Sequence, residues 1–406
     1  MRASTPDPNP PLDGVRVLEF SHAIMGPSAG LVLADLGADV IKVEPAPDGD
    51  TTRKLRGFTA GFFSYFNRNK RSIAIDLKTE AGLALLHRLV ERADVVIENF
   101  APGTMDRLGC GYAALSAINP RLVYCALKGF LSGPYEHRPA LDEVVQFMGG
   151  LAYVTGPPGQ PLRAGTSVVD IMGGAMAVIA ILAALRERDR TGTGQLVKSA
   201  LFESTVFMMG QHMAGGAIMG EEVQPMTVRR GGWGIYQIFK TGDDDQVFVG
   251  VTSDQHWKRF CDAFGLAELY ADPRLATNAD RVEQRPWMIP KVAAALIRYD
   301  KAEILERCEA ASIPFAPVAK VEDLFDDPHL NASGALLDVT LPGGIRTKLP
   351  RLPIEIGDHP LGVTREAPGV GEHTREILAE LGLGASDIAE LESKGVVTDA
   401  KGARGA

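Results

Sequence analysis

Short apolar runs alternate with helix-patterned segments over the first third of the chain, and this alternation constrains the fold more than any other feature. Val15–Phe20 is the first run, Leu31–Leu36 follows with helical spacing, and Val40–Val43 is the next run. Further strands are expected at 72–76, 94–98 and 122–126, and a helix at 78–91. Because a strand–helix–strand crossover makes consecutive strands parallel, we predict an α/β fold with a large Rossmann-like domain.

The turn after the first strand does not carry a dinucleotide-binding signature. Gly26 and Gly30 lie in it, but without the GxGxxG spacing. Glu44, at the end of the second strand, is then only weak support for a contact to a ribose. Binding of a nicotinamide dinucleotide is therefore not expected.

A single carboxylate, Asp170, is embedded in an apolar stretch. It follows Val168 and Val169 and precedes the Gly/Ala-rich segment 171–185, with no cationic residue before Arg186. Burying an unpaired ionised carboxylate costs several kcal/mol, so such a group is normally hydrogen-bonded, protonated or used for chemistry. Asp is also a favoured N-cap residue, and a helix beginning at Ile171 is an equally good interpretation. A capping Asp and a reactive Asp are compatible, because a cap fixes the direction of the carboxylate.

Basic residues lie close to the ends of the expected strands. A basic run is most often a solvated surface. Here the positions favour a crevice for a phosphorylated ligand, because open α/β sheets bind ligands at strand ends. The residues concerned are Arg68, Lys70, Arg71, Lys78, Arg107 and Lys128.

Composition narrows the function classes. The 406-residue chain is 45% hydrophobic and carries a formal charge of −9, with a pI near 5.5, which argues against nucleic-acid binding. The N-terminal 14 residues are Pro-rich and polar and are expected to be a flexible arm, as is the C-terminal segment DAKGARGA. The longest apolar run, 175–185, is about half of the ~20 residues that span a bilayer, so no membrane segment is predicted. Four widely spaced cysteines indicate neither a disulfide framework nor a metal site and favour a cytoplasmic location: Cys110, Cys125, Cys261 and Cys308.

The second half of the chain changes pattern. Segment 196–218 is apolar, Met-rich and helically spaced, which is typical of core packing. A hairpin is predicted at 235–239 and 246–251, followed by helices at 255–264, 286–297 and 301–311. A Pro/Gly-rich, strand-like stretch leads to Ile356, and helices are expected at 372–381 and 385–394. We therefore expect a large domain over 1–200, a linker helix at 201–226, a smaller α+β domain at 227–325, and a return to the large domain over 326–406.

Several long segments, in order, resemble the family III coenzyme A transferases, the CaiB/BaiF family that includes the formyl-CoA transferases. They are PLDGVRVLEFSHAIMGP, LGADVIKVEP, NRNKRSIAIDLKT, ADVVIENFAPGTMDRLG, LKGF and SVVDIMGGAMAVIAILAALRERDRTGTGQ. The resemblance covers nearly the whole chain. It implies a Rossmann-like large domain, a small middle domain, and interlocked homodimers in which each subunit threads the other.

The resemblance also implies a mechanism. The family's catalytic aspartate falls on Asp170. It would attack an acyl-CoA thioester, giving a mixed anhydride and then an aspartyl-CoA thioester, and a free carboxylic acid would reverse the sequence. No permanently bound cofactor and no metal is implied. Coenzyme A and small carboxylic acids are the expected partners, without nucleic acid or membrane.

The resemblance places further site residues by position. Some members of the family have an arginine directly after the Glu of the second strand, where this chain has Pro45, so nucleotide contacts would come from Arg71 or Lys70. Asp142 or Glu143 matches an acidic residue near the nucleophile, and His22 is a candidate for orienting substrate or a structural residue. The CoA site would comprise Ala23, Ile24, Met25, Arg71, Ile75, Lys78, Asn99, Phe100, Arg107 and Arg138.

The glycines of the segment RRGGWG are expected to serve the developing oxyanion. Backbone N–H groups of Gly231 and Gly232, in a loop that closes over the site, are the donors we expect. Successive glycines also suit a simple turn.

Two other functions remain open from the sequence. An acyl-CoA racemase of the same fold would need a His/Asp acid–base pair, and the stretch 138–142 lacks a histidine beside Asp142. A catalytically silent CoA-binding protein is the other alternative. A dicarboxylyl donor such as succinyl-CoA is favoured by loop arginines that suit a distal carboxylate, although surface residues would look the same: Arg53, Arg56, Arg163, Arg229 and Arg230.

Overall fold

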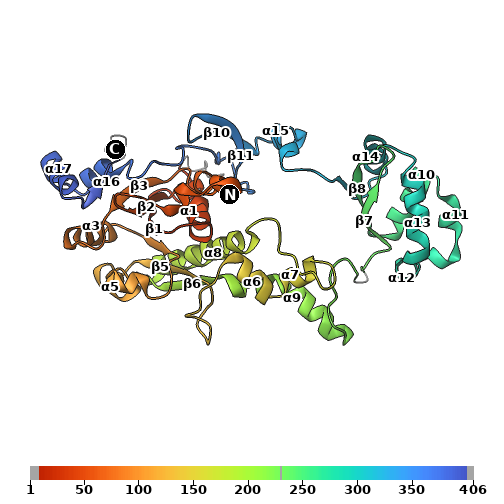
Figure 1. Ribbon diagram of the computed structural model, residues 1–406, viewed down its shortest axis with the longest axis horizontal. Coiled ribbons are helices and arrows are strands. Elements are labelled where there is room, and N and C mark those ends of the chain that lie inside the picture. Colours follow the sequence, from red (N-terminus) through yellow and green to blue (C-terminus); the bar gives the residue numbers. More distant parts are fainter. Residues whose placement is uncertain (1–8, 229–230, 400–406) are drawn as a thin grey trace, which may run out of the picture. The chain divides into compact units, whose positions relative to one another are not determined.

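The structure is a computed structural model that describes residues 9–228 and 231–399. The chain divides into two compact units, one made of Met1–Thr227 with Ala332–Ala406 and the other of Val228–Asn331. The small domain expected at 227–325 corresponds to the second unit, which extends to Asn331. Each unit has its own apolar core. Figure 1 labels the helices and strands of both units.

A seven-stranded sheet with the order β12-β3-β2-β1-β4-β5-β6 is the centre of the first unit. The six strands β1 to β6 are parallel, whereas the short β12 pairs antiparallel with β3. The strands are β1 (Arg16–Phe20), β2 (Asp39–Pro45), β3 (Arg71–Ile75), β4 (Val95–Glu98), β5 (Val123–Lys128), β6 (Leu196–Ala200) and β12 (Val397–Thr398). A mixed α/β fold with a large, mostly parallel sheet is thus confirmed.

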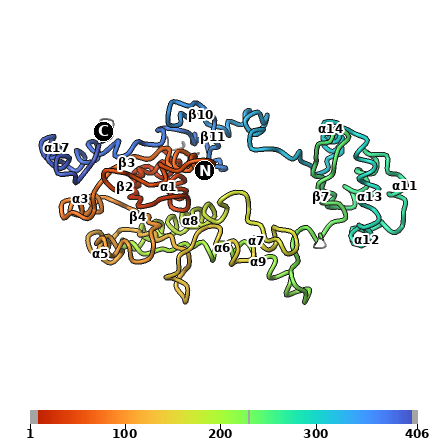
Figure 2. Tube along the Cα trace, in the orientation of Figure 1, coloured from red at the N-terminus to blue at the C-terminus, as the bar shows by residue number. Residues whose placement is uncertain are grey.

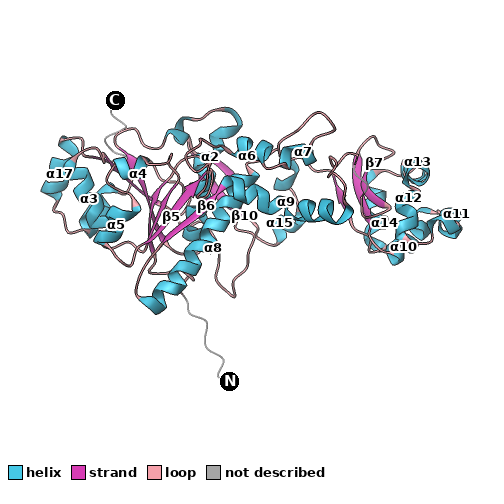
Figure 3. Ribbon diagram, turned by 90° about the horizontal axis from the view of Figure 1, so that it is seen from below, coloured by secondary structure: helices cyan, strands magenta, loops and turns pink. Residues whose placement is uncertain are grey.

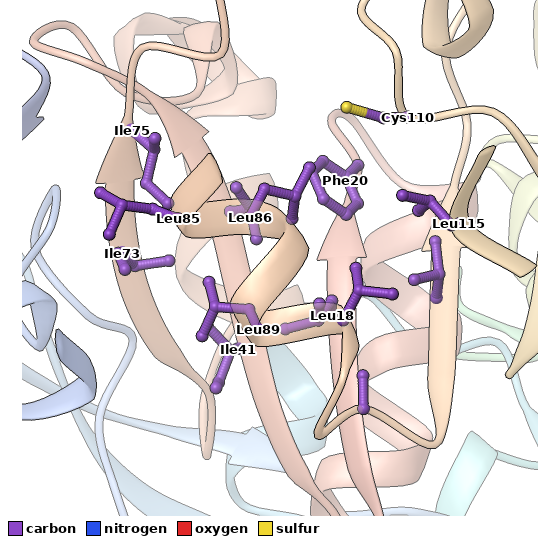
Figure 4. Packing of buried hydrophobic residues seen from close by; sticks show 14 of the residues in the cluster. Leu18, Phe20, Ile41, Ile73, Ile75, Leu85, Leu86, Leu89, Cys110 and Leu115 are labelled. Atoms are coloured by element: carbon purple, nitrogen blue, oxygen red, sulfur yellow. The ribbon is translucent and has the colours of Figure 1, made fainter. Parts of the chain in front are cut away.

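Helices cover both faces of this sheet, because successive side chains of each buried strand point to opposite faces. Leu18 and Phe20 of β1 pack against the layer that contains α3 (Figure 4). Val17 packs on the other face, against the layer of α1 and α8. Figure 3 shows α8 and the strands of the sheet from another side. The helices of this unit are α1 (Met25–Asp35), α2 (Gly61–Phe66), α3 (Glu80–Val90), α4 (Thr104–Arg107), α5 (Tyr112–Ile118), α6 (Asp142–Met148), α7 (Leu151–Thr155), α8 (Val168–Thr191), α9 (Leu201–Met219), α16 (Thr374–Glu380) and α17 (Ala385–Ser393).

The C-terminal segment returns to the sheet of the first unit. Thr398 of β12 pairs with Ala74 of β3, and α16 and α17 pack into the same core as α3 (Figure 2). His373 holds β3 at Ser72 through two hydrogen bonds, donating its N–H to the Ser72 carbonyl at 2.9 Å and accepting the Ser72 N–H on Nδ1 at 3.2 Å. The first and last parts of the chain therefore complete one domain.

Close packing of α8 on α1 depends on two glycines. A Cβ at Gly173 would lie 2.5 Å from Met25 Cε, and one at Gly174 would lie 2.1 Å from Ser28 Oγ and 2.8 Å from the Met25 carbonyl oxygen. The absence of side chains at these positions lets the two helix backbones approach. The first turns of α8 are thereby fixed beside the beginning of α1.

Among the described residues, α8 is the one helix whose length and apolar composition would allow a membrane crossing. Its inner face packs on α1 and the sheet, with Ala177 and Ile181 fully buried. Arg186, Arg188 and Arg190 lie in its last turns. These features are typical of the core helix of an α/β domain.

The second unit consists of a three-stranded antiparallel sheet, β7-β8-β9, with helices packed around one core. Trp257, Phe260 and Phe264 of α10 fill much of that core. The elements are β7 (Ile235–Lys240), β8 (Gln246–Val251), α10 (Asp254–Phe264), α11 (Ala267–Ala271), α12 (Asn278–Glu283), α13 (Arg285–Leu296), α14 (Lys301–Ala310) and β9 (Phe315–Pro317). The hairpin expected at 235–251 is present.

Two local predictions, for segment 196–218 and for residues 9–14, were wrong. Segment 196–218 is not one helical segment, because Leu196–Ala200 pairs with β5 as strand β6 before α9 begins. The strand-like stretch expected before Ile356 is confirmed as a hairpin of β10 (Leu336–Leu341) and β11 (Ile345–Pro350), which turns at Gly343 and Gly344, both with positive φ. Residues 9–14 are not a free arm, since the Leu12 N–H donates to the Leu36 carbonyl at 2.9 Å. The remaining parts of the expected arm and tail, 1–8 and 400–406, lie outside the described residues.

The helix contact at Gly174 gives a stability prediction. Gly174→Ala should lower the free energy of unfolding by about 1–3 kcal/mol, because the new methyl group overlaps the Met25 backbone. Gly61→Ala is the matched control, since Gly61 is exposed with open space around its Cβ position, and should be neutral or stabilising by up to about 1 kcal/mol. Urea unfolding followed by circular dichroism measures both. Equal stability of the two variants would contradict this account of the contact.

Candidate active site

The strand order reverses direction between β1 and β4, and open α/β sheets bind ligands at the carboxyl ends of strands at such a point. The turns that follow these two strands are joined here. The His22 N–H donates to Asn99 Oδ1 at 3.0 Å, and Asn99 Nδ2 donates to the His22 carbonyl at 2.8 Å. The rings of His22 and Phe100 stack with centroids 5.5 Å apart. Residues expected at the CoA site from two distant segments therefore lie together.

The turn after β1 has a strained backbone. Ala23 has φ of +59°, a left-handed conformation that L-residues rarely adopt, and its N–H donates to Thr52 Oγ1 at 2.9 Å. Ile24 and Met25 are buried, with 3% and 4% of their surface exposed.

Asp170 lies in the first turn of α8, near the beginning of α1. The helix begins at Val168 after Ser167, so the prediction that Asp170 caps a helix from Ile171 was wrong. Gly173 and Gly174 follow Asp170 by three and four residues and so share its face of the helix, where they contact Met25 and Ser28. The nucleophile candidate is therefore one helical turn from the contact with the proposed CoA-binding turn.

The free N–H groups of α8 are bound by a carboxylate from elsewhere in the chain. Asp142 Oδ2, on α6, accepts hydrogen bonds from the N–H groups of Val169 at 2.9 Å and Asp170 at 3.1 Å. Gln146 is fully buried, donates to Asp142 Oδ1, and accepts the Ala164 N–H at 2.9 Å. Asp142 thus performs the capping role that the sequence suggested for Asp170, and it holds a negative charge beside it.

This environment disfavours the charged form of Asp170. Burial, and then the charges of Asp142 and Glu143, raise the pKa of Asp170 to about 7. Stability should therefore fall as pH rises from about 4 to 7, because the unfolded chain loses this proton at lower pH. A desolvated carboxylate near its pKa at neutral pH is typical of reactive sites.

The basic run 68–71 does not line the site, contrary to the prediction. Arg68 pairs with Asp35 at 2.6 Å, Lys70 with Glu19 at 2.7 Å, and Arg71 with Asp39 at 2.6 Å. All three are at most 5% exposed. Arg71 begins β3 and so lies at the amino edge of the parallel sheet, opposite the carboxyl ends. These cations are used for internal ion pairs because carboxylates face them from α1, β1 and β2.

Other expected CoA-site residues do lie near the carboxyl edge. Lys78 follows β3 and Arg107 lies in α4 after β4, and both are exposed, while Ile75 at the end of β3 is buried. Lys128, at the end of β5, is held by Glu98 at 2.6 Å. Arg138 is exposed and lies over the Tyr135 ring at 4.7 Å.

The loop arginines differ in their freedom to bind a substrate carboxylate. Arg53 is committed to Glu44 at 2.6 Å and to the Pro368 carbonyl at 2.8 Å. Arg163 faces Glu143 at 3.5 Å, and Arg56 is exposed. Arg229 and Arg230 lie outside the described residues.

Gly231 and Gly232 belong to the second unit, and their loop is anchored to α12 and α13. Asn278 Nδ2 donates to the Gly232 carbonyl at 2.8 Å. Arg285 Nη1 donates to the carbonyls of Trp233 at 3.1 Å and Gly234 at 2.8 Å. The loop carbonyls are therefore held by the unit that carries them.

Sequence reasoning did not find Thr52 or Gln146. Thr52 carries no local pattern that connects it to Ala23, 29 positions away. The spacing of Asp142 and Gln146 on one helical face was the available signal for that pair. Within residues 9–228 and 231–399, no group of three or more His, Cys, Asp or Glu side chains is arranged to hold a metal ion.

Similar proteins identify the family of the chain. The model of CoA-transferase family III matches residues 12–374. The chain is 36% identical over 388 residues to a succinate–glutarate CoA-transferase of Agrobacterium fabrum, covering 93% of this chain and 97% of the relative. It is 36% identical over 409 residues to a formyl-CoA:oxalate CoA-transferase of Streptomyces avermitilis, covering 95% and 99%.

A solved structure shares the fold. The crystal structure of a CaiB/BaiF family protein from Brucella suis has a TM-score of 0.80 and 36% identity, covering 92% of this chain and all of that one. The family model and these relatives each extend over most of the chain. The protein therefore belongs to CoA-transferase family III and is a CoA-transferase.

Proposed function

We propose that the protein moves CoA from a dicarboxylyl-CoA to a free carboxylic acid, with Asp170 as the nucleophile. The observation that carries this proposal is the setting of Asp170, a largely buried carboxylate with its pKa raised to about 7. It lies beside the turn at the carboxyl edge where α/β folds bind ligands. Asp142 fixes the backbone of that residue through the Asp170 N–H.

The proposed reaction conserves CoA and both acids. The Asp170 carboxylate attacks the thioester carbonyl, the C–S bond breaks, and CoA thiolate leaves a mixed anhydride. The thiolate then attacks the Asp170 carbonyl carbon, which releases the donor acid as a carboxylate and gives an aspartyl-CoA thioester. The acceptor carboxylate attacks this thioester, and the returning thiolate cleaves the second anhydride at the acceptor carbonyl to give the new acyl-CoA and free Asp170.

The acidic surroundings of Asp170 favour this chemistry. Asp142 and Glu143 disfavour the ionised side chain, as the raised pKa of Asp170 records. An acylated or thioester-linked Asp170 carries no charge. The covalent intermediates are therefore relieved of the repulsion that the free carboxylate experiences.

We propose that CoA occupies the carboxyl edge of the large sheet. The joined turns at His22 and Asn99 support this placement, as do the exposed cations Lys78 and Arg107 near it, which suit phosphates. Contacts are proposed for Ala23, Ile24, Met25, Ile75, Lys78, Asn99, Phe100, Arg107 and Arg138. Arg71 is dropped from this set because of its place at the amino edge.

A dicarboxylate is the substrate class we propose. The names of the two relatives above include succinate, glutarate and oxalate, all of which are dicarboxylates. Arg56, an exposed residue of the first unit, is the arginine we propose for binding a distal carboxylate.

We also propose that the chain acts in the cytoplasm as an interlocked homodimer. The four cysteines are free and buried, in keeping with a reducing compartment. Large apolar side chains are exposed on two long helices, Ile179 at 60% on α8 and Phe207 at 70% and Met213 at 60% on α9. Such faces are typical of subunit contacts.

Trapping tests the nucleophile. After incubation with succinyl-CoA, hydroxylamine should convert Asp170 to a hydroxamate that peptide mass spectrometry detects. Asp170→Asn and Asp170→Ala should lose exchange by more than about 10³-fold because the covalent path is gone. Asp189→Asn, an exposed change on the same helix, should keep it. Labelling at another residue, or exchange by Asp170→Ala, would contradict the role of Asp170.

The charge of Asp142 should set the pH dependence. Activity requires ionised Asp170, so kcat/KM for acyl-CoA should rise with pH through about 7. Asp142→Asn keeps an oxygen that can accept from the α8 N–H groups, but it removes a charge that raises the pKa of Asp170. The rise of kcat/KM with pH should therefore occur at lower pH in this variant. Glu143→Gln should move it in the same direction by less, in keeping with the smaller effect of that charge. A shift to higher pH would refute the electrostatic explanation.

Subunit exchange tests the interlocked dimer. The protein should sediment at twice the chain mass of 43.5 kDa. Two differently tagged preparations should not form mixed dimers on mixing, whereas co-expressed chains should, because threaded subunits separate only on unfolding. A monomer would contradict the dimer, and rapid exchange would contradict interlocking.

A further inference from the structure

Strain at Ala23 has to be held by its surroundings. A left-handed L-residue costs about 1–2 kcal/mol and persists where neighbouring groups fix it. The next residues, Ile24 and Met25, lead directly into α1. The conformation of Ala23 therefore decides how this whole turn is presented at the carboxyl edge.

A closed ring of hydrogen bonds and one ion pair holds this turn. The Ala23 N–H donates to Thr52 Oγ1 at 2.9 Å, and the Thr52 N–H donates to Asp50 Oδ1 at 2.8 Å. Asp50 Oδ2 pairs with Lys42 Nζ at 3.0 Å, and Lys42 Nζ donates to the Ser21 carbonyl at 2.7 Å. Ser21 lies two residues before Ala23, so the ring begins and ends in the turn.

The ring is sealed from solvent. Lys42 is 0% exposed, Thr52 4% and Asp50 5%. Burial disfavours both charges, yet the charges of Glu19, Asp50 and Glu44 raise the pKa of Lys42, and Lys42 lowers the pKa of Asp50. Both partners of this buried pair therefore stay charged and keep their geometry. Thr52 is the member of the ring that touches the strained residue.

We propose that Thr52 is a positioning residue that fixes the Ala23–Met25 turn in its CoA-binding conformation before CoA arrives. This inference rests on the proposed location of the CoA site. Thr52 accepts from the Ala23 N–H and has no part in the covalent steps at Asp170. Its loss should therefore weaken CoA binding and leave the chemistry at saturation unchanged, because a turn that is not pre-organised must be ordered on binding.

The test compares Thr52→Val, which keeps the shape but removes the acceptor, with Thr52→Ser, which keeps it. Thr52→Val should raise the Kd of free CoA, measured by calorimetry, and the KM of acyl-CoA by about 10-fold, with kcat and the KM of the acid within about 2-fold. Thr52→Ser should restore values close to wild type. Thr51→Val, an exposed neighbour in the same short helix, is the matched control and should change nothing.

The outcomes separate the positioning role of Thr52 from the proposed function. Unchanged CoA affinity in Thr52→Val, failure of Thr52→Ser to restore it, or equal loss of kcat with a lowered melting temperature would overturn the positioning role. Wild-type protein that binds CoA but exchanges none would overturn the proposed function alone, since the Kd comparison would still report on Thr52. Wild-type protein that binds no CoA would overturn both.

Discussion

The contact between α1 and α8 at Gly173 and Gly174 is the constraint on which the site depends. It brings the first turn of α8, and with it Asp170, beside the turn that follows β1. Both helices run back across the same face of the parallel sheet, so their amino ends meet at the carboxyl edge. A larger side chain at either glycine would separate the proposed nucleophile from the proposed ligand site.

The position and the pKa of Asp170 also depend on a residue that is distant in the sequence. Asp142 on α6 binds the amino end of α8 and also raises the pKa of Asp170. One carboxylate thus performs two tasks, holding the backbone and setting the protonation of its neighbour. Gln146 keeps that carboxylate in place through a buried hydrogen bond.

The periodic parts of this fold were predictable and the long-range parts were not. Strands β1 to β5 were predicted from apolar runs between helical segments, because a strand that is buried on both faces of a sheet consists of consecutive apolar residues. Strand β6 was missed because a five-residue run before a helix has no period of its own. The resemblance singled out Asp170, whereas its cap came from a residue 28 positions away, which no local pattern reveals.

The basic run 68–71 shows a different limit. We expected its cations to line a crevice for a phosphorylated ligand because they lie near the end of a strand. In the structure they are neutralised in the interior by Asp35, Glu19 and Asp39. The sequence alone does not tell whether a cationic side chain is buried in an ion pair or exposed to a ligand. Polar residues at strand ends therefore predict that charge is needed there, without saying whether a ligand or the protein supplies the counter-charge.

The return of the C-terminal segment has a consequence for biosynthesis. Arg53 binds the Pro368 carbonyl and His373 binds Ser72, contacts that span 315 and 301 positions. A chain emerging from the ribosome thus carries the loop of Thr52 long before the residues that brace it exist. The contacts that the C-terminal segment makes with Arg53 and with Ser72 therefore form only after that segment has been synthesised.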